Sequence, residues 1–222
     1  MSDKINIVSV NVGLPRTIQQ GNREVTTAIL KTPQKDRVTV NVSGLSDDSI
    51  CDPRFHGGPD QAVYIYRQED YEWWQGELKR DIAPGTFGEN LIVSGIPDAG
   101  LFIGDVVNLP DLGLQITAPR IPCATFAATM GDPKFVKQFL RAKRPGFYCR
   151  VLKAGTVGVD DKGELVRYAK PSILTTTLYG DIQRKLNRSE LEVYLALPID
   201  IRNRTNFEKS LATLNTEGEI NE

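Results

Sequence analysis

The N-terminal run reads Ile5-Asn6-Ile7-Val8-Ser9-Val10-Asn11-Val12 and alternates apolar with polar residues, which is the pattern of a half-buried strand. Residues 37–42 repeat the pattern. Further strands are predicted at 24–30, 62–66, 90–93, 105–109, 114–118, 147–153 and 156–159. Glycines stand where turns are needed, at Gly13, Gly44, Gly95, Gly104, Gly155 and Gly163. So many short strands favour a mainly β domain, either a sandwich or a partly closed barrel.

Two helices interrupt these strands. In residues 68–79 the large apolar side chains recur at i, i+3 and i+7 and so share one face. Residues 133–143 follow Asp132 as a predicted N-cap, with Pro133 in the first helical position. Their aromatic residues also share one face. We interpret both aromatic stripes as core packing rather than as a platform for a cofactor.

The character of the chain changes after about residue 170. The predicted β domain spans residues 1–170, and a short helical segment with a frayed end spans 171–222. The run Ser189-Glu190-Leu191-Glu192 fits a capping box at the start of one helix, and residues 206–214 are predicted to form another.

The composition excludes several classes of protein. With 222 residues, of which 40% are hydrophobic and 25% charged, the chain can build a core and is not of the disordered class. Its net charge of −1 disfavours binding to nucleic-acid polymers, which requires a basic surface. No apolar run approaches the roughly 20 residues that span a bilayer, and residues 1–6 lack a signal sequence. We therefore expect a cytoplasmic protein without a membrane partner.

The cysteine and histidine counts limit the metal chemistry. Cys51, Cys123 and Cys149 are an odd number of widely spaced thiols without a Cys-x-x-Cys pair, so neither a disulfide framework nor a structural zinc site is indicated. His56 is the only histidine, which excludes any site with two or three imidazole ligands. We expect Cys51 and Cys149 to be structural.

Cys123 lies in an unusual local setting. It follows Pro119 and Pro122, which fix their own φ angles and restrict the residues before them. A thiol on a stiff turn beside the guanidinium of Arg120 can hold a soft metal or act as a reactive sulfur. The alternative is that Cys123 is buried and behaves as a small hydrophobe, as free cysteines usually do.

Two glycine-containing loops are further candidates. In the first, Arg54 and His56 face the same way if the chain is extended, and Gly57-Gly58 lets the backbone approach a ligand. That loop suits an anion such as phosphate, although an ordinary turn explains it equally. In the second, residues 85–91, Asn90 can read the edge of a heterocycle with one donor and one acceptor, or it holds the turn together.

These segments occur in the order expected for a MOSC domain, the family named after the C-terminal domain of molybdenum-cofactor sulfurases. They are Arg54-Phe55-His56-Gly57-Gly58-Pro59-Asp60, Phe87-Gly88-Glu89-Asn90-Leu91, Ile103-Gly104-Asp105 and Pro119-Arg120-Ile121-Pro122-Cys123. The chain resembles the stand-alone bacterial YiiM-like branch, in which three short helices follow the domain. The resemblance covers residues 1–170 and, more weakly, the tail. It implies a MOSC-type β-barrel that binds molybdopterin-type molybdenum cofactor.

The resemblance also implies roles for individual residues. In cofactor-containing relatives the motif cysteine coordinates molybdenum, and Cys123 matches that cysteine. The residues expected to hold the cofactor are Arg54, Gly57, Gly58, Gly88, Asn90, Arg120, Thr125 and Arg150. One or more arginines would bind the pterin phosphate, and Asn90 would contact the pterin edge. His56 would be catalytic, as a proton donor or an orienting group.

Relatives reduce N-hydroxylated compounds such as hydroxylaminopurines and amidoximes, so the resemblance implies a molybdenum-dependent reductase. The chain has neither an iron–sulfur cysteine motif nor a dinucleotide fingerprint, so we expect a separate flavin or iron–sulfur protein to supply electrons. Three alternatives stay open. Cys123 could carry a persulfide and deliver sulfur or cofactor to another enzyme, Cys123 and His56 could form an acyl-transfer pair, or the domain could store the cofactor.

Overall fold

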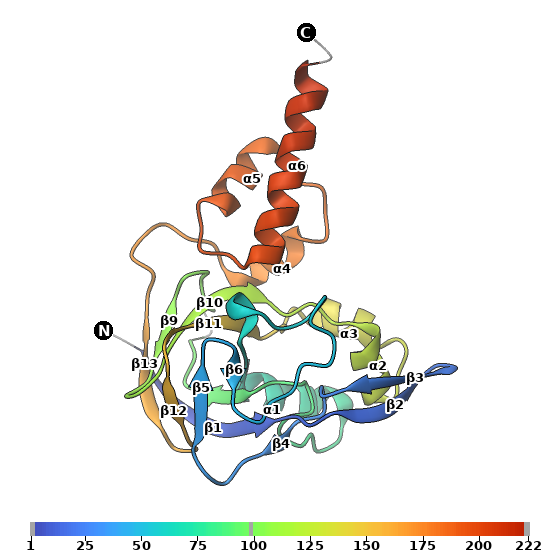
Figure 1. The fold of residues 1–222 in the computed structure, drawn as a ribbon, viewed down its shortest axis with the longest axis vertical. Coiled ribbons are helices and arrows are strands. Elements are labelled where there is room, and N and C mark those ends of the chain that lie inside the picture. Colours follow the sequence, from blue (N-terminus) through green and yellow to red (C-terminus); the bar gives the residue numbers. More distant parts are fainter. Residues whose placement is uncertain (1–2, 98–99, 220–222) are drawn as a thin grey trace.

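The computed structural model describes residues 3–97 and 100–219 and consists of a β-barrel with a helical segment standing on it (Figure 1). The barrel strands are β1 (Asp3–Val12), β7 (Val63–Arg67), β8 (Leu91–Ser94), β9 (Val106–Asn108), β10 (Gly113–Pro119), β11 (Phe147–Lys153) and β13 (Lys162–Val166). They pair in the order β13-β9-β10-β11-β7-β8-β1, and β1 also pairs with β13, which closes the barrel. Only β7 and β8 run parallel.

Alternation on the strands fills the barrel with apolar side chains. On β1, Ile5 and Ile7 are buried in the interior, whereas Lys4 and Asn6, which alternate with them, are exposed. Strand β7 differs, because all residues from 63 to 66 are buried. Its outer face is covered by helices, so this strand lacks the alternation of an exposed one.

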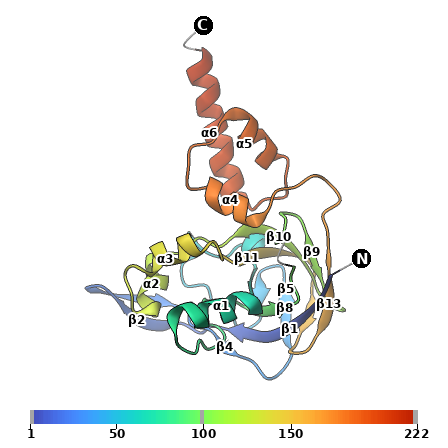
Figure 2. The ribbon, with the colours of Figure 1, turned by 180° about the vertical axis from the view of Figure 1, so that it is seen from behind.

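Three helices form that cover: α1 (Gln68–Leu78), α2 (Ala124–Met130) and α3 (Phe135–Ala142), which lie on the same side of the barrel (Figure 2). Their aromatic side chains pack with Tyr66 of β7, whose ring stacks on Phe87 with a centroid distance of 4.8 Å. Trp74 and Phe139 stack at 5.8 Å and are fully buried. The interpretation of the aromatic stripes as core packing is therefore confirmed.

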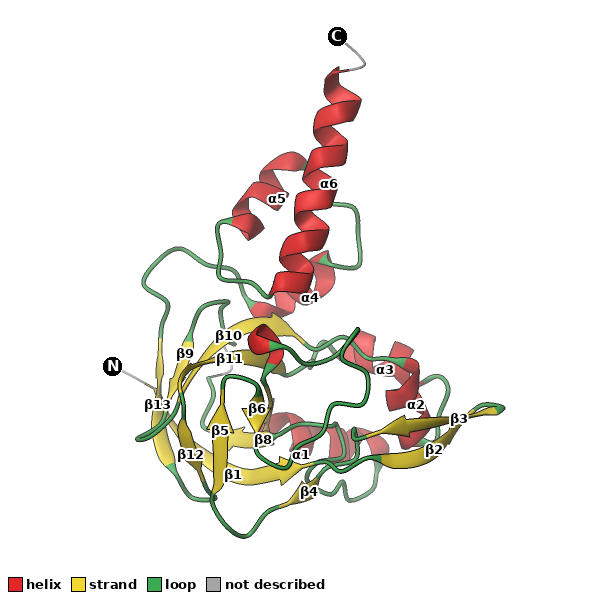
Figure 3. Cartoon of the chain, viewed as in Figure 1, coloured by secondary structure: helices red, strands yellow, loops and turns green. Residues whose placement is uncertain are grey.

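The remaining strands build the rim of the barrel (Figure 3). They are β2 (Arg16–Gln20) and β3 (Arg23–Thr27), which form a hairpin, β4 (Thr32–Pro33), and the sheet of β5 (Val38–Asn41), β6 (Gly44–Leu45) and β12 (Gly155–Val157). A single 3-10 turn, η1 (Pro59–Gln61), precedes β7. The long loop between β6 and η1 contains no strand and carries Arg54 and His56.

The C-terminal segment consists of α4 (Thr175–Asp181), α5 (Arg188–Leu195) and α6 (Ile201–Glu219), and α6 extends away from the barrel (Figure 1). Leu178, Tyr194 and Phe207 are buried in the same apolar cluster as the barrel interior. The predicted mainly β fold with a helical tail is confirmed. None of the helices within residues 3–97 and 100–219 has both the length and the apolar character needed to cross a membrane.

Every predicted strand has a counterpart in the structure, but β13, the strand that closes the barrel, was not predicted. Gly163, predicted in a turn, lies in β13 and pairs with Ile5. A Cβ there would come within 2.4 Å of the Asn108 carbonyl oxygen, so the glycine permits a close approach of strands. Gly155, also predicted in a turn, begins β12.

The helix ends also differ from the predictions. Helix α2 was not predicted, and α3 begins at Phe135 because the Asp132 carboxylate accepts the Lys134 N–H in a preceding turn instead of capping the helix. The capping box of α5 joins Asn187 and Glu190 rather than the run from Ser189. Helix α6 is longer than the predicted 206–214; of the predicted frayed end, 220–222 lie outside the described residues.

Candidate functional site

A cleft of about 840 Å³ opens at the end of the barrel where β7, β8 and β11 begin and β10 ends. The β2–β3 hairpin, the loop before η1 and the start of α2 form its walls. The predicted site residues that line it are Arg54, His56, Gly57, Gly88, Asn90, Arg120, Cys123 and Thr125. Segments far apart in the sequence therefore meet around one cavity.

Cys123 is the N-cap of α2 and lies in the cleft wall with an extended backbone, φ −119° and ψ 171°. Its thiol is half-buried. Burial raises its pKa, but a hydrogen bond with the His56 imidazole, the Phe126 N–H and the charge of Arg120 outweigh burial and lower the pKa to about 7. The interpretation of Cys123 as a reactive thiol fits this setting better than that of a small hydrophobe, whereas Cys149 is fully buried and burial raises its pKa.

Arg120 lies behind Cys123 and is only 5% exposed. Its Cζ atom lies 4.0 Å from the ring centroid of Phe126 and 5.3 Å from that of Tyr64. Its Nη1 atom is buried and has no hydrogen-bond partner among the described residues. A buried guanidinium with a free donor is costly, and an anion bound in the cleft would supply the missing acceptor.

The loop that carries Arg54 and His56 is exposed to solvent. The Arg54 guanidinium pairs with Asp52 at 2.9 Å, and its side chain is 78% exposed. The His56 N–H donates to the Asp52 carbonyl at 3.1 Å, so the backbone turns and does not keep the extended form considered from the sequence. The imidazole nevertheless reaches Cys123. Both side chains are therefore available to a ligand in the cleft.

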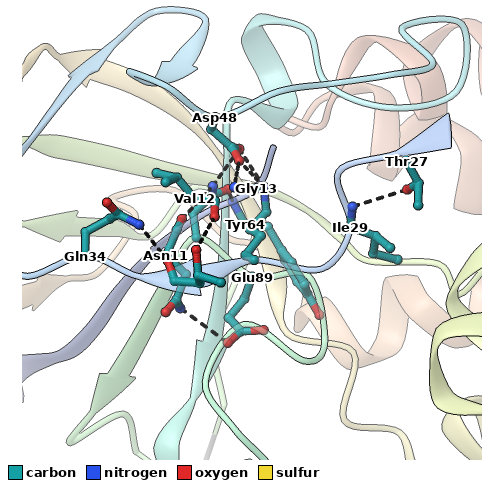
Figure 4. Close-up of polar contacts among 12 residues, drawn as sticks. Asn11, Val12, Gly13, Thr27, Ile29, Gln34, Asp48, Tyr64 and Glu89 are labelled. Atoms are coloured by element: carbon teal, nitrogen blue, oxygen red, sulfur yellow. Dashed lines mark hydrogen bonds and ion pairs between the residues drawn. The ribbon is translucent and has the colours of Figure 1, made fainter. Parts of the chain in front are cut away.

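Asn90 belongs to the scaffold of the cleft. Its side-chain oxygen accepts the Tyr64 N–H at 3.0 Å, and its amide donates to Asp48 at 2.8 Å and to the Asn11 carbonyl at 3.4 Å. Asp48 also binds Lys31, and it accepts the Gly13 N–H (Figure 4). Both amide hydrogens of Asn90 are thus engaged by the protein, which supports the structural alternative over a contact with a heterocycle edge.

Two smaller contacts complete the wall. The Thr125 hydroxyl donates to Gln20 at 2.9 Å and ties α2 to the β2–β3 hairpin. Gly88 has φ 78°, and a Cβ there would lie 2.9 Å from the Ile29 side chain. Both residues line the cleft and also hold its shape.

Two predicted cofactor residues do not line the cleft. Arg150 donates to the carbonyls of Pro198 and Ile199 at 3.2 and 3.0 Å, and its Nε lies 3.1 Å from Asp60. It joins the barrel to the tail, and its position does not support the predicted contact with a phosphate. Gly58 is the residue before η1 and faces open space.

The cleft also includes residues that the sequence reasoning missed. Lys31, Asp48, Tyr64 and Tyr148 line it, as does Cys51, which was expected to be structural only. The residue types and spacing around these positions do not indicate a binding site. The pairing of the strands in three dimensions brings these residues to the cleft. Among the described residues, no three His, Cys, Asp or Glu side chains are grouped to hold a metal ion.

Known proteins resemble this chain in sequence and in structure. The model of the MOSC domain family matches residues 52–164. The chain is 33% identical over 171 residues to the uncharacterized protein YflK of Bacillus subtilis strain 168, an alignment that covers 77% of each protein. It is 31% identical over 157 residues to a protein of Gibberella moniliformis named reductase, covering 68% of this chain and 28% of that protein. The crystal structure of YiiM from Geobacillus stearothermophilus aligns with a TM-score of 0.75 and 27% identity over 93% of this chain and 99% of that one.

Proposed function

Because the chain belongs to the MOSC domain family and is YiiM-like, we propose that it binds molybdenum cofactor in the cleft around Cys123 and reduces N-hydroxylated compounds. Hydroxylaminopurines and amidoximes are the proposed substrates, and a separate flavin or iron–sulfur protein is the proposed electron donor. The observation that carries the proposal is that a thiol of lowered pKa lies in the same cleft wall as Arg120, whose buried Nη1 has no hydrogen-bond partner among the described residues.

The residues present fit such a cofactor. A thiolate is a suitable ligand for a soft metal, and Cys123 presents one in the cleft wall. The free Nη1 of Arg120 suits an anionic group, and Arg23 adds positive charge to the lining. Lys31 and Arg54 also line the cleft, where they pair with Asp48 and Asp52. The cleft of about 840 Å³ is large enough for a heterocycle together with a small substrate.

Each residue then has a definable task. When bound, the cofactor would supply the two electrons that, with two protons, convert an N-hydroxyl compound to an amine and water. Cys123 would hold the metal, and Arg120 with Arg54 would bind the anionic part of the pterin. His56, at the exposed edge of the cleft, would hold a proton for the departing oxygen.

One observation favours a second candidate. His56 lowers the pKa of the Cys123 thiol, as the base of an acyl-transfer pair would, and Arg120 could stabilise a developing oxyanion. The reductase is the stronger proposal because the cleft is large and cationic and because a relative is named reductase.

Metal analysis of the full chain, made in a host that synthesises molybdenum cofactor, tests the proposal. We expect molybdenum and pterin fluorescence in the wild type and in Cys51→Ser, which removes the other thiol of the cleft, and neither in Cys123→Ser. Absence from the wild type would overturn the proposal. Release of thiocyanate on cyanide treatment, dependent on Cys123, would instead support a persulfide carrier. Ester hydrolysis that requires both Cys123 and His56 but no molybdenum would support acyl transfer.

An activity assay tests the electron donor. The loaded protein should reduce a hydroxylaminopurine with a reductase fraction from the same host and should be inactive with NAD(P)H alone. Turnover with NAD(P)H alone would contradict the proposed need for a separate electron-donor protein.

A further inference from the structure

The C-terminal helix places an arginine on the loop that carries His56. From the first turn of α6, Arg202 donates through Nη1 to the Gly57 carbonyl at 2.8 Å and to Gln61 Oε1 at 2.7 Å. Through Nη2 it donates to the Pro53 and His56 carbonyls at 3.2 and 3.1 Å. Both terminal nitrogens of one guanidinium are therefore bound to the segment from Pro53 to Gln61.

The turn from Pro53 to Gly58 has few other anchors. The loop between β6 and η1 is fixed at its start, where Asp48 accepts the Gly13 N–H at 2.7 Å and the Ser49 N–H donates to the Gly13 carbonyl at 2.9 Å. Beyond Ser49 it lies outside any strand, and its exposed side chains include Arg54, Phe55 and His56. The Phe55 and His56 N–H groups both donate to the Asp52 carbonyl at 3.3 and 3.1 Å, which holds the turn but does not attach it to the barrel. The attachment of the turn is thus supplied largely from the tail.

The start of α6 is itself fixed on the barrel. The Ile201 N–H donates to Asp60 at 2.9 Å, and Asp200 is fully buried and accepts the Arg202 N–H at 3.1 Å. The Asp200 N–H donates to the Thr117 carbonyl of β10 at 3.3 Å. Arg202 therefore projects from a rigid base toward a loop that lacks one of its own.

We propose that Arg202 is a positioning residue that fixes the loop carrying His56 in the cleft wall that also includes Cys123, so that the helical tail completes the site. The inference rests on the proposed function for the tasks of His56 and Cys123, but the geometry of the contact does not depend on the cofactor. It gives the tail a specific role in the site.

The contact requires an arginine. Three backbone carbonyls and one side-chain oxygen converge on the two terminal nitrogens of a planar fork. A lysine offers three donors on a single atom and cannot reproduce that geometry. Arg202→Lys should therefore keep the charge and lose most of the positioning.

Amide hydrogen exchange of the loop tests the proposal independently of catalysis. The full chain is made without molybdenum cofactor and transferred to deuterium oxide at about pH 7, and deuterium uptake of the peptides that cover residues 53–61 is quantified by mass spectrometry. We expect Arg202→Gln to speed exchange in those peptides roughly tenfold, because the four hydrogen bonds from Arg202 to this segment are lost. Arg202→Lys should lie between that variant and the wild type.

Arg204→Gln is the matched control. Arg204 lies two residues along α6 and donates to the carbonyls of Leu195 and Leu197 at 3.0 and 2.7 Å, so it makes comparable bonds within the tail. The control should lose thermal stability to a similar extent and keep the wild-type rate of exchange in residues 53–61.

The outcomes separate the two proposals. Wild-type exchange of residues 53–61 in Arg202→Gln, or an equal increase in Arg204→Gln, would overturn the positioning role. If Arg202→Gln shows no cooperative melting transition, the same comparison is made with Arg202→Lys. Absence of molybdenum from the wild type would refute the proposed function and leave the exchange result intact. In the loaded protein, Arg202→Gln should keep its molybdenum and lower kcat.

Discussion

The loop from Asp52 to Gly58 and the loop from Gly85 to Asn90 border the same cleft and are built in opposite ways. Both contain glycines with positive φ, between 69° and 90°. In the second loop Glu89 and Asn90 are buried, and Glu89 Oε1 accepts the Tyr71 hydroxyl at 2.6 Å and the Gly85 N–H at 2.5 Å. In the first loop the side chains of residues 54 to 56 face solvent.

The two loops differ in how their polar groups are used. The buried loop uses most of its polar groups within the fold, because a buried polar group without a partner is costly, and among the described residues only Glu89 Oε2 of this loop lacks a hydrogen-bond partner. The exposed loop keeps the His56 imidazole accessible and is instead held through its carbonyls by Arg202. We therefore assign the buried loop to the scaffold of the cleft and the exposed loop to contact with a ligand.

The largest effect should come from Asn90→Ala. The change leaves the buried Tyr64 N–H without its partner and removes one of the two donors to an Asp48 oxygen, which keeps only Lys31, so we expect the free energy of unfolding to fall by about 3 kcal/mol. His56→Ala, on the exposed loop, should change it by less than about 0.5 kcal/mol. Urea denaturation measures both. Equal losses in the two variants would break the assignment of Asn90 to the scaffold.

Glu89 should give the buried loop a pH dependence. Burial raises its pKa to about 7, although hydrogen bonds from Tyr71 and Gly85 lower it. The folded protein therefore holds this proton when the unfolded chain has released it. The protonated Glu89 contributes its full stabilisation at pH values below the pKa of the carboxyl in the unfolded chain. This contribution is lost as the pH rises from that pKa through the folded pKa of about 7.

Glu89→Gln should remove this dependence. Between about pH 5 and about pH 8 the wild type should lose roughly 2.5 kcal/mol more stability than the variant does. Urea denaturation of both proteins at the two pH values gives the difference, in which contributions from other groups cancel. Parallel pH profiles would show that the Glu89 carboxyl is already ionised in the folded protein at the lower pH.

The fold was predictable where local pattern and pairing agree. Alternation in residues 5–12 predicted β1, whereas β13 was hidden because Gly163, which favours a turn locally, is required by the close approach of Asn108. The start of α6 was also missed. Its first N–H is capped by Asp60, a residue of the barrel, and no local pattern encodes that contact.

The motif residues of the site could be predicted from the sequence, but the residues that hold them in place could not. Cys123, His56 and Arg120 carry chemistry that can be recognised from residue type and order. Arg202 acts through bonds to carbonyl oxygens 145 to 149 positions earlier in the chain, and nothing in its own neighbourhood indicates them. Asn90 was ambiguous because an amide reads the same in a turn and in a binding site until its partners are known.

A smaller effect should distinguish the two thiols of the cleft. The lowered pKa of about 7 makes Cys123 half thiolate near neutral pH, whereas burial raises the pKa of Cys51. Allowing for the lower intrinsic nucleophilicity of a more acidic thiol, Cys123 should alkylate roughly fivefold faster than Cys51 at about pH 7. His56→Ala should move the midpoint of the Cys123 profile to higher pH. An unchanged midpoint would show that His56 does not lower the pKa of the Cys123 thiol.

The smallest effect should come from Arg54→Ala. Arg54 is exposed and already paired with Asp52. A ligand that binds Arg54 must therefore replace Asp52 as its partner. Such exposed ion pairs contribute little free energy. We expect an unchanged melting temperature and roughly twofold less retained molybdenum after purification from a cofactor-competent host. Arg80→Ala, an exposed arginine outside the cleft lining, is the control and should retain the wild-type amount. Complete loss of molybdenum in Arg54→Ala would show that the exposed loop, and not the buried Arg120, provides the main anion contact.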